Sequence, residues 1–169
     1  MISSDTERPA KPDMDRLIAE YGSSLLRLCC LLLKNKAQAE DAVQDTFIKV
    51  YEKYASFEGR SSEKTWITAI AVNACRNYLR SPWHRRNAGE EGLYLAEQSP
   101  PELPDGTVMQ AVMKLPAKYR EVILLAYYQE LRTGEIAGIL GIPAATVATR
   151  LRRARHMLEG ELREWYFDE

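Results

Sequence analysis

Hydrophobic residues recur at steps of three and four along three stretches in the first half of the chain, residues 14–32, 39–54 and 66–79. This spacing predicts three amphipathic helices, each burying one stripe of side chains. Polar residues suited to capping separate the stripes: Asn35, Ser61 and Ser62. No stretch alternates with a period of two for long enough to form a strand. The expected fold class is therefore all-α, with Ile18 and Tyr51 among the residues that the stripes predict to be buried.

Two shorter stripes follow in the second half, over residues 108–113 and 122–127, and Asp105 is placed to cap the first of them. Between the halves, residues 84–107 carry a net charge of −3 and several helix-breaking residues: Gly89, Gly92, Pro100, Pro101, Pro104 and Gly106. Such a stretch buries little apolar surface and holds no long helix. The sequence thus predicts two small helical domains, 13–83 and 108–169, joined by a flexible acidic linker, 84–107.

The most specific motif begins at Thr133, which we expect to cap a helix. Ala137 is small where two helices would cross closely, and Gly141 follows four residues later, where a tight turn needs positive φ. Val147, six residues beyond Gly141, would close the core between the helices. This spacing predicts a helix-turn-helix, with an ordinary helical hairpin as the alternative.

The second helix of this motif has an outward face near its start, formed by Ala145, Thr146, Thr149, Arg150 and Arg153. The N-terminal half of such a helix is the part that enters a DNA major groove. Arginine forms paired hydrogen bonds with guanine, and threonine methyl groups contact thymine. Arg152 and Arg155 lie to the flanks of this face, where we expect them to contact phosphates.

Two polar faces stand out in the first half of the chain. One combines amides and guanidinium groups at helical spacing, which suits contacts with bases and phosphates: Asn73, Arg76, Asn77 and Arg80. The other gathers carboxylates and an amide near the start of the second predicted helix: Glu40, Asp41, Gln44 and Asp45. For both faces, an ordinary solvated helix surface is the alternative, and carboxylates also favour the positive end of a helix dipole.

The amino-acid composition and net charge exclude several classes of function. The chain has 169 residues, 46% of them hydrophobic, and a net charge of −1, which excludes a uniformly basic nucleic-acid-binding protein but allows local basic faces. Cys29, Cys30 and Cys75 lack the spacing of zinc ligands, and we expect all three to be buried thiols. No phosphate-binding glycine loop and no nucleophile–base pair is visible, so we expect no enzyme, cofactor or metal. The N-terminus lacks the apolar core of a signal peptide, which predicts a cytoplasmic protein.

Three segments in order resemble the extracytoplasmic-function (ECF) sigma factors, small two-domain bacterial transcription initiation factors. Residues 39–51 look like the family's segment for binding core RNA polymerase, and residues 65–80 look like its −10 recognition helix. Residues 115–125, with the helix-turn-helix after them, look like the domain that reads the −35 element. The resemblance extends from about Asp15 to Leu162. It departs at Arg132–Glu135, where one acid is missing, and at Ala148-Thr149, where the family usually has Lys-Ser.

The resemblance implies a factor that binds core RNA polymerase and directs it to promoter DNA. It assigns polymerase binding to the face that contains Asp41 and Asp45, and −10 recognition to the helix that contains Asn73 and Arg76. It also implies that the loop before this helix captures a base turned out of the −10 duplex, using Arg60, Ser61, Ser62 and Lys64. A further implied partner is an anti-sigma factor, often membrane-bound.

Two other functions fit part of the pattern. A stand-alone helix-turn-helix regulator would bind a palindrome as a dimer and would give no transcription starts with core polymerase. A purely structural helical interaction protein would leave the arginine cluster as a solvated face. Run-off transcription with purified core polymerase distinguishes the three.

Overall fold

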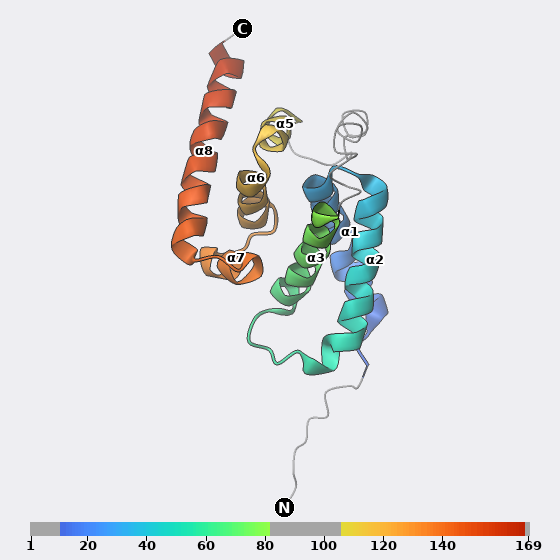
Figure 1. The fold of residues 1–169 in the computed structure, drawn as a ribbon. Helices are drawn as coiled ribbons and strands as arrows, with labels where there is room; N and C mark the ends of the chain where they lie inside the picture. The colour runs from blue at the N-terminus through green and yellow to red at the C-terminus, as the bar shows by residue number, and fades with distance from the viewer. Residues whose placement is uncertain (1–10, 82–105, 168–169) are drawn as a thin grey trace, which may run out of the picture.

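The computed structural model describes residues 11–81 and 106–167, and they form two groups of helices (Figure 1). The N-terminal group contains α1 (Met14–Leu33), α2 (Lys36–Lys53), the short 3-10 helix η1 (Tyr54–Ser56) and α3 (Glu63–Arg80). The C-terminal group contains α5 (Gly106–Lys114), α6 (Ala117–Ile123), the π-helical segment η2 (Leu124–Tyr128), α7 (Thr133–Leu140) and α8 (Ala144–Phe167). The described residues contain no strand, which confirms the all-α fold class. Residues 84–105 of the predicted linker, Asp105 among them, lie outside these residues, and the last two residues of the linker, 106 and 107, belong to α5.

Side-chain caps start the three N-terminal helices. The carboxylate of Asp13 accepts a hydrogen bond from the Arg16 amide at 3.1 Å, and Asn35 accepts one from the Gln38 amide at 2.9 Å. Ser62, the second of the two serines considered, caps α3 through the Thr65 amide. The three helices pack on one another around fully buried aliphatic side chains that include Leu28, Val50 and Ile67.

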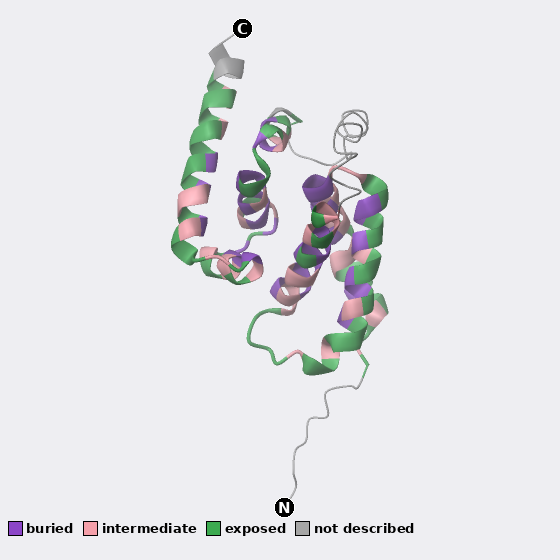
Figure 2. Ribbon diagram, viewed as in Figure 1, coloured by how far each residue is buried: buried purple, intermediate pink, exposed green. Residues whose placement is uncertain are grey.

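Two residues of the predicted stripes are not in this core. Ile18 is 49% exposed and Tyr51 is 45% exposed, so the prediction that they are buried is wrong. The stripe on each helix is wider than the surface that the neighbouring helices cover, and the residues at its edge remain in solvent (Figure 2). Both residues are therefore available to a partner.

The C-terminal group forms the predicted helix-turn-helix from α7 and α8. Val147 and Ile136 are fully buried between the helices, as the motif requires. Gly141 ends α7 in the left-handed conformation, with φ of 66°. Thr133 is not the cap: α7 begins at Thr133 itself, because the Glu135 carboxylate reaches back to accept a hydrogen bond from the Arg132 amide at 3.1 Å.

The outer side of this group also differs from the prediction. Val108 is 41% exposed and Tyr127 is 60% exposed, although both belong to apolar stripes. They line an open apolar groove between α5, η2 and the later part of α8, together with Met109 and Leu158. No described element covers this groove.

Replacing Gly141 with alanine is expected to lower the free energy of unfolding by about 1–2 kcal/mol, the cost of a left-handed L-residue. Nothing lies within 4 Å of the place where a Cβ would stand, so backbone strain is the only cost. Gly138→Ala is the matched control, because this glycine is inside α7 and equally unobstructed. It should be neutral or stabilising. Urea unfolding compares the two, and equal destabilisation would show that the turn does not depend on positive φ.

Candidate polymerase and nucleic-acid interfaces

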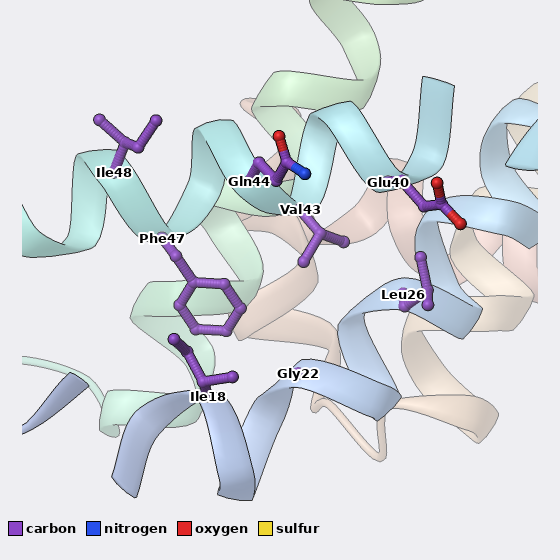
Figure 3. A pocket seen from close by; sticks show the side chains of 8 residues that line it. All are labelled: Ile18, Gly22, Leu26, Glu40, Val43, Gln44, Phe47 and Ile48. Atoms are coloured by element: carbon purple, nitrogen blue, oxygen red, sulfur yellow. The ribbon is translucent and has the colours of Figure 1, made fainter. Parts of the chain in front are cut away.

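An apolar groove runs between α1 and α2 (Figure 3) and encloses about 560 Å³. Ile18 and Phe47 face each other across it, and the missing side chain of Gly22 leaves its floor open. Ile48, at its outer edge, is 56% exposed. An open apolar surface of this kind, bordered by polar groups, is typical of a protein-binding site.

The structure divides the four residues expected to bind polymerase into two pairs. Glu40 and Gln44 line the groove. Asp41 and Asp45, although exposed, lie toward α3, where they interact with Tyr78. Burial raises the pKa of Tyr78, and the charges of Asp45 and Asp41 add to this increase. The apolar members of the groove were not among the expected site residues. The sequence shows the hydrophobic spacing of these residues, but that spacing predicts a buried helix face and does not distinguish it from an exposed binding surface.

The face of α3 expected to read the −10 element is partly solvent-exposed. Asn73, Asn77 and Arg80 are exposed. Arg76 is not: its guanidinium donates to the carbonyl oxygen of Leu140 at 3.1 Å and lies 3.5 Å from the carboxylate of Glu121, both in the C-terminal group.

The loop before α3 holds the remaining predicted −10 residues. Ser61 is exposed, and Ser62 is occupied as the helix cap. Arg60 is 87% exposed at its side chain and pairs with Glu58 at 2.9 Å. Lys64 points away from this loop and donates to the carbonyl oxygen of Gln129 at 2.7 Å.

A carboxylate network fixes the start of α3. Both oxygens of Glu63 accept hydrogen bonds from the Arg16 guanidinium at 3.0 Å, and the hydroxyls of Tyr21 and Tyr54 donate to them at 3.0 and 2.9 Å. The hydrogen bond from Arg16 holds the pKa of Glu63 below its usual range. Burial, together with the hydrogen bond to Glu63, raises the pKa of Tyr21 to about 12. The network joins α1, η1 and α3 at the base of the loop.

Replacing Glu63 with glutamine should lower the melting temperature at neutral pH and have progressively less effect in acid. A carboxyl whose pKa is depressed on folding contributes stability that is complete above its unfolded pKa and disappears as the pH falls through the folded pKa. Glu63 has such a depressed pKa. Glu20→Gln is the control, since Glu20 pairs with the same arginine from within α1 but its side chain is 51% exposed. A melting-temperature difference for Glu63→Gln that does not change with pH would contradict this account.

The start of α8 forms a second polar surface with α6. Five predicted base-reading residues line one shallow depression, Ala145, Thr146, Thr149, Arg150 and Arg153, and the structure adds Lys118 and Tyr119 to them. A hydrogen bond with Arg153 lowers the pKa of Tyr119. Arg152 and Arg155 do not line the depression, and Arg155 instead lies over the ring of Tyr127 at 5.8 Å. Lys118 and Tyr119 were missed because they precede the motif in the chain.

The three cysteines are free thiols that differ in burial. Within residues 11–81 and 106–167, no group of three His, Cys, Asp or Glu side chains could hold a metal ion. Cys29 and Cys75 are buried as expected, whereas Cys30 is only half-buried. The hydrogen bond between Cys29 and Cys75, together with burial, raises the pKa of Cys29.

The helices in the described part of the chain include none long and apolar enough to cross a membrane.

Comparison with known proteins places both helical groups in one family. Residues 17–85 match the family model of sigma-70 region 2, and residues 105–158 match that of sigma-70 region 4. The ECF RNA polymerase sigma factor SigW of Bacillus subtilis is 34% identical, with 97% of this chain and 98% of SigW covered. The ECF RNA polymerase sigma-E factor of Haemophilus influenzae is 32% identical, with 90% of this chain and 88% of that protein covered.

A solved structure agrees with this. The sigma factor RpoE, crystallised with the anti-sigma factor NepR from Bartonella quintana, matches with a TM-score of 0.70 and 26% identity, over 89% of this chain and 97% of RpoE. The chain belongs to the sigma-70 family of RNA polymerase sigma factors, within its extracytoplasmic-function group.

Proposed function

We propose that this sigma factor binds core RNA polymerase through the groove between α1 and α2, and reads promoters with α3 and the start of α8. The observation that supports this most directly is the pair of family matches, region 2 over 17–85 and region 4 over 105–158. The two candidate DNA surfaces lie in different matched regions, as reading two separated promoter elements requires. The role is regulatory: the factor selects where the polymerase starts.

The groove is suited to the polymerase because it offers apolar surface to bury and polar side chains at its border that would orient the partner. Ile18 and Ile48 are already exposed at its edges, so a partner helix would bury them without unfolding either helix. Glu40 and Gln44 border the same groove and would orient a partner that carries basic or amide groups. Asp41 and Asp45 would contribute from the adjoining side.

The DNA assignments divide by chemistry. On α8, Arg150 and Arg153 stand beside Thr146 and Thr149, which combines guanine-binding guanidinium groups with methyl groups for thymine. On α3, Asn73 and Asn77 supply amide groups beside Arg80. The exposed loop at Arg60 and Ser61 would hold an extruded base, since unstacking costs a few kcal/mol that hydrogen-bond partners must offset.

The net charge of −1 supports dependence on polymerase. Affinity for duplex DNA grows with the number of phosphates that a protein neutralises, and this chain concentrates few cations on each surface. We therefore propose that it acts in the cytoplasm with the polymerase. We also propose an anti-sigma factor as a second partner, since the RpoE structure contains one.

Run-off transcription with purified core polymerase and a library of promoter fragments tests the proposal. Starts at specific positions that require this chain support it. DNA binding without polymerase and without starts would instead indicate a stand-alone helix-turn-helix regulator.

A further inference from the structure

The depression beside α8 has a second wall, which the first turn of α6 forms with Lys118 and Tyr119. Both residues precede the helix-turn-helix, so neither belongs to the helix expected to enter the DNA. A lysine and a tyrosine that line the same depression as Arg150 and Arg153 can contact the DNA directly, or they can hold the arginines in place. The surroundings of Tyr119 favour the second role.

Tyr119 is held rigidly although it reaches the surface of the depression. Its backbone amide donates to the carbonyl oxygen of Pro116 at 2.9 Å, in the first turn of α6. The residue belongs to the hydrophobic core and is only 7% exposed. A tyrosine side chain has only two rotatable angles, so a ring packed in this way keeps its phenol oxygen in one place.

Arg153 has the opposite properties. It is exposed on α8, and a long arginine side chain can adopt many conformations in solvent. It forms a hydrogen bond with the phenol of Tyr119, which lowers the pKa of that phenol. Arginine has no acceptor, so its guanidinium donates and the phenol oxygen accepts. The Lys118 ammonium lies 5.0 Å from the centre of the same ring and adds its positive charge.

The other base-reading arginine is held by a different kind of group. The guanidinium of Arg150 lies 4.0 Å from the carboxylate of Glu121, which also belongs to α6. A carboxylate attracts a guanidinium strongly, but it also cancels much of the charge that would attract DNA. A neutral phenol orients a guanidinium and leaves its charge in place. Tyr119 can therefore hold Arg153 without competing with a nucleic acid for it.

We infer that Tyr119 is the positioning residue for Arg153: it accepts one guanidinium hydrogen bond and leaves the other N–H groups directed across the depression at a base edge of the −35 element. This inference rests on the proposed function, which gives Arg153 its base. Arginine has five N–H donors and guanine recognition uses two of them, so one can bind Tyr119 throughout. Immobilising a long side chain on binding costs free energy, and a side chain that is already oriented avoids that cost.

Tyr119→Phe tests this directly, because it removes the acceptor oxygen and keeps the buried ring. In the assembled holoenzyme, this variant should reduce discrimination at the −35 position that Arg153 reads by about three- to tenfold, as expected for one lost hydrogen bond. The preferences at the other −35 positions should remain. Run-off transcription from promoters with single changes in the −35 element measures this. A uniform loss on all promoters would show that Tyr119 contacts the DNA backbone or supports the fold, and would overturn the inference.

Tyr127→Phe is the matched control, since it removes the same hydroxyl from a tyrosine that is 60% exposed and does not line the depression. It should leave every −35 preference unchanged. A double-mutant cycle adds a test that a merely structural role would not pass. In an Arg153→Ala background, Tyr119→Phe should cause no further loss of discrimination, because the residue that it positions is absent. Additive losses would contradict the inference.

Nuclear magnetic resonance tests the hydrogen bond in the free chain, without DNA or polymerase. The carbon-13 resonance of the Tyr119 phenol carbon is identified by its absence from Tyr119→Phe, and its titration reports the pKa. Arg153→Ala should raise this pKa, because the hydrogen bond that lowers it is lost, whereas Arg152→Ala should leave it unchanged. An unchanged pKa in Arg153→Ala overturns the inference. An Arg153→Ala holoenzyme that keeps every −35 preference would instead overturn the base-reading role in the proposed function, whatever the titration shows.

Discussion

Replacing Ile48 with aspartate is expected to weaken binding to core RNA polymerase at least about 100-fold while leaving the fold intact. Burying an isoleucine side chain at an interface contributes about 1.5–3 kcal/mol, and an unpaired carboxylate in its place costs several kcal/mol more. Ile48 is 56% exposed in the free chain, so the charge costs nothing there. A binding titration with labelled core polymerase measures the loss, and circular dichroism verifies the fold.

Tyr51→Asp provides the matched control. Tyr51 lies on the same helix, is 45% exposed and does not line the groove. Its replacement should change polymerase affinity by less than about threefold, within the range of ordinary surface substitutions. If both variants lose affinity equally, the polymerase contacts a broader face of α2 than the groove. If neither does, the groove is not the polymerase site.

The second large effect concerns the arginines of α8. Arg153→Ala in the assembled holoenzyme should reduce transcription from the preferred promoter by about 5- to 150-fold, the equivalent of about 1–3 kcal/mol for one base-reading arginine. It should also relax the preference at one −35 position, because a lost base contact no longer distinguishes the bases. Arg150→Ala should reduce transcription to a similar extent and relax the base preference at a neighbouring −35 position.

Arg152→Ala supplies the comparison, since Arg152 is exposed on the same helix but does not line the depression of Arg150 and Arg153. It should weaken all promoter variants equally and flatten the dependence on salt, as expected for a phosphate contact. Transcription from a set of promoters with single changes in the −35 element separates the two behaviours. Identical profiles for Arg152 and Arg153 would contradict the division between base and phosphate contacts.

Local chemistry made much of the fold predictable. Asn35 and Ser62 cap helices as expected, because a side-chain oxygen beside an unpaired amide is favoured by its immediate neighbours alone. Gly141 was predictable because a tight turn after a helix needs positive φ, which glycine adopts without a steric penalty. Thr133 was assigned as a cap wrongly because the competing group, Glu135, lies within the helix and satisfies the Arg132 amide from there.

Contacts between distant parts of the chain were beyond the sequence pattern. Arg76 has the spacing of an exposed DNA-binding residue, and only the packing of α7 against α3 explains why it binds Leu140. The stripe that includes Ile18 indicated an apolar face but not how much of it the neighbouring helices cover. Hydrophobic periodicity indicates which side of a helix is apolar. How much of that side is buried depends on how much of it the neighbouring helices cover.

The wide turn of η2 is the equivalent of one inserted residue in an otherwise regular helix. Its signature is the hydrogen bond from the Gln129 amide to the Leu124 carbonyl oxygen at 3.0 Å, which spans five residues in place of four. Deleting one residue from this turn would restore α-helical spacing and rotate everything after it by about 100°. Gln129 would then turn away from Ser24 and Lys64, and the helix-turn-helix would follow it. The length of this turn therefore sets the angle at which the promoter-reading helix is presented, so homologues with a deletion here should differ in domain orientation even where every side chain is kept.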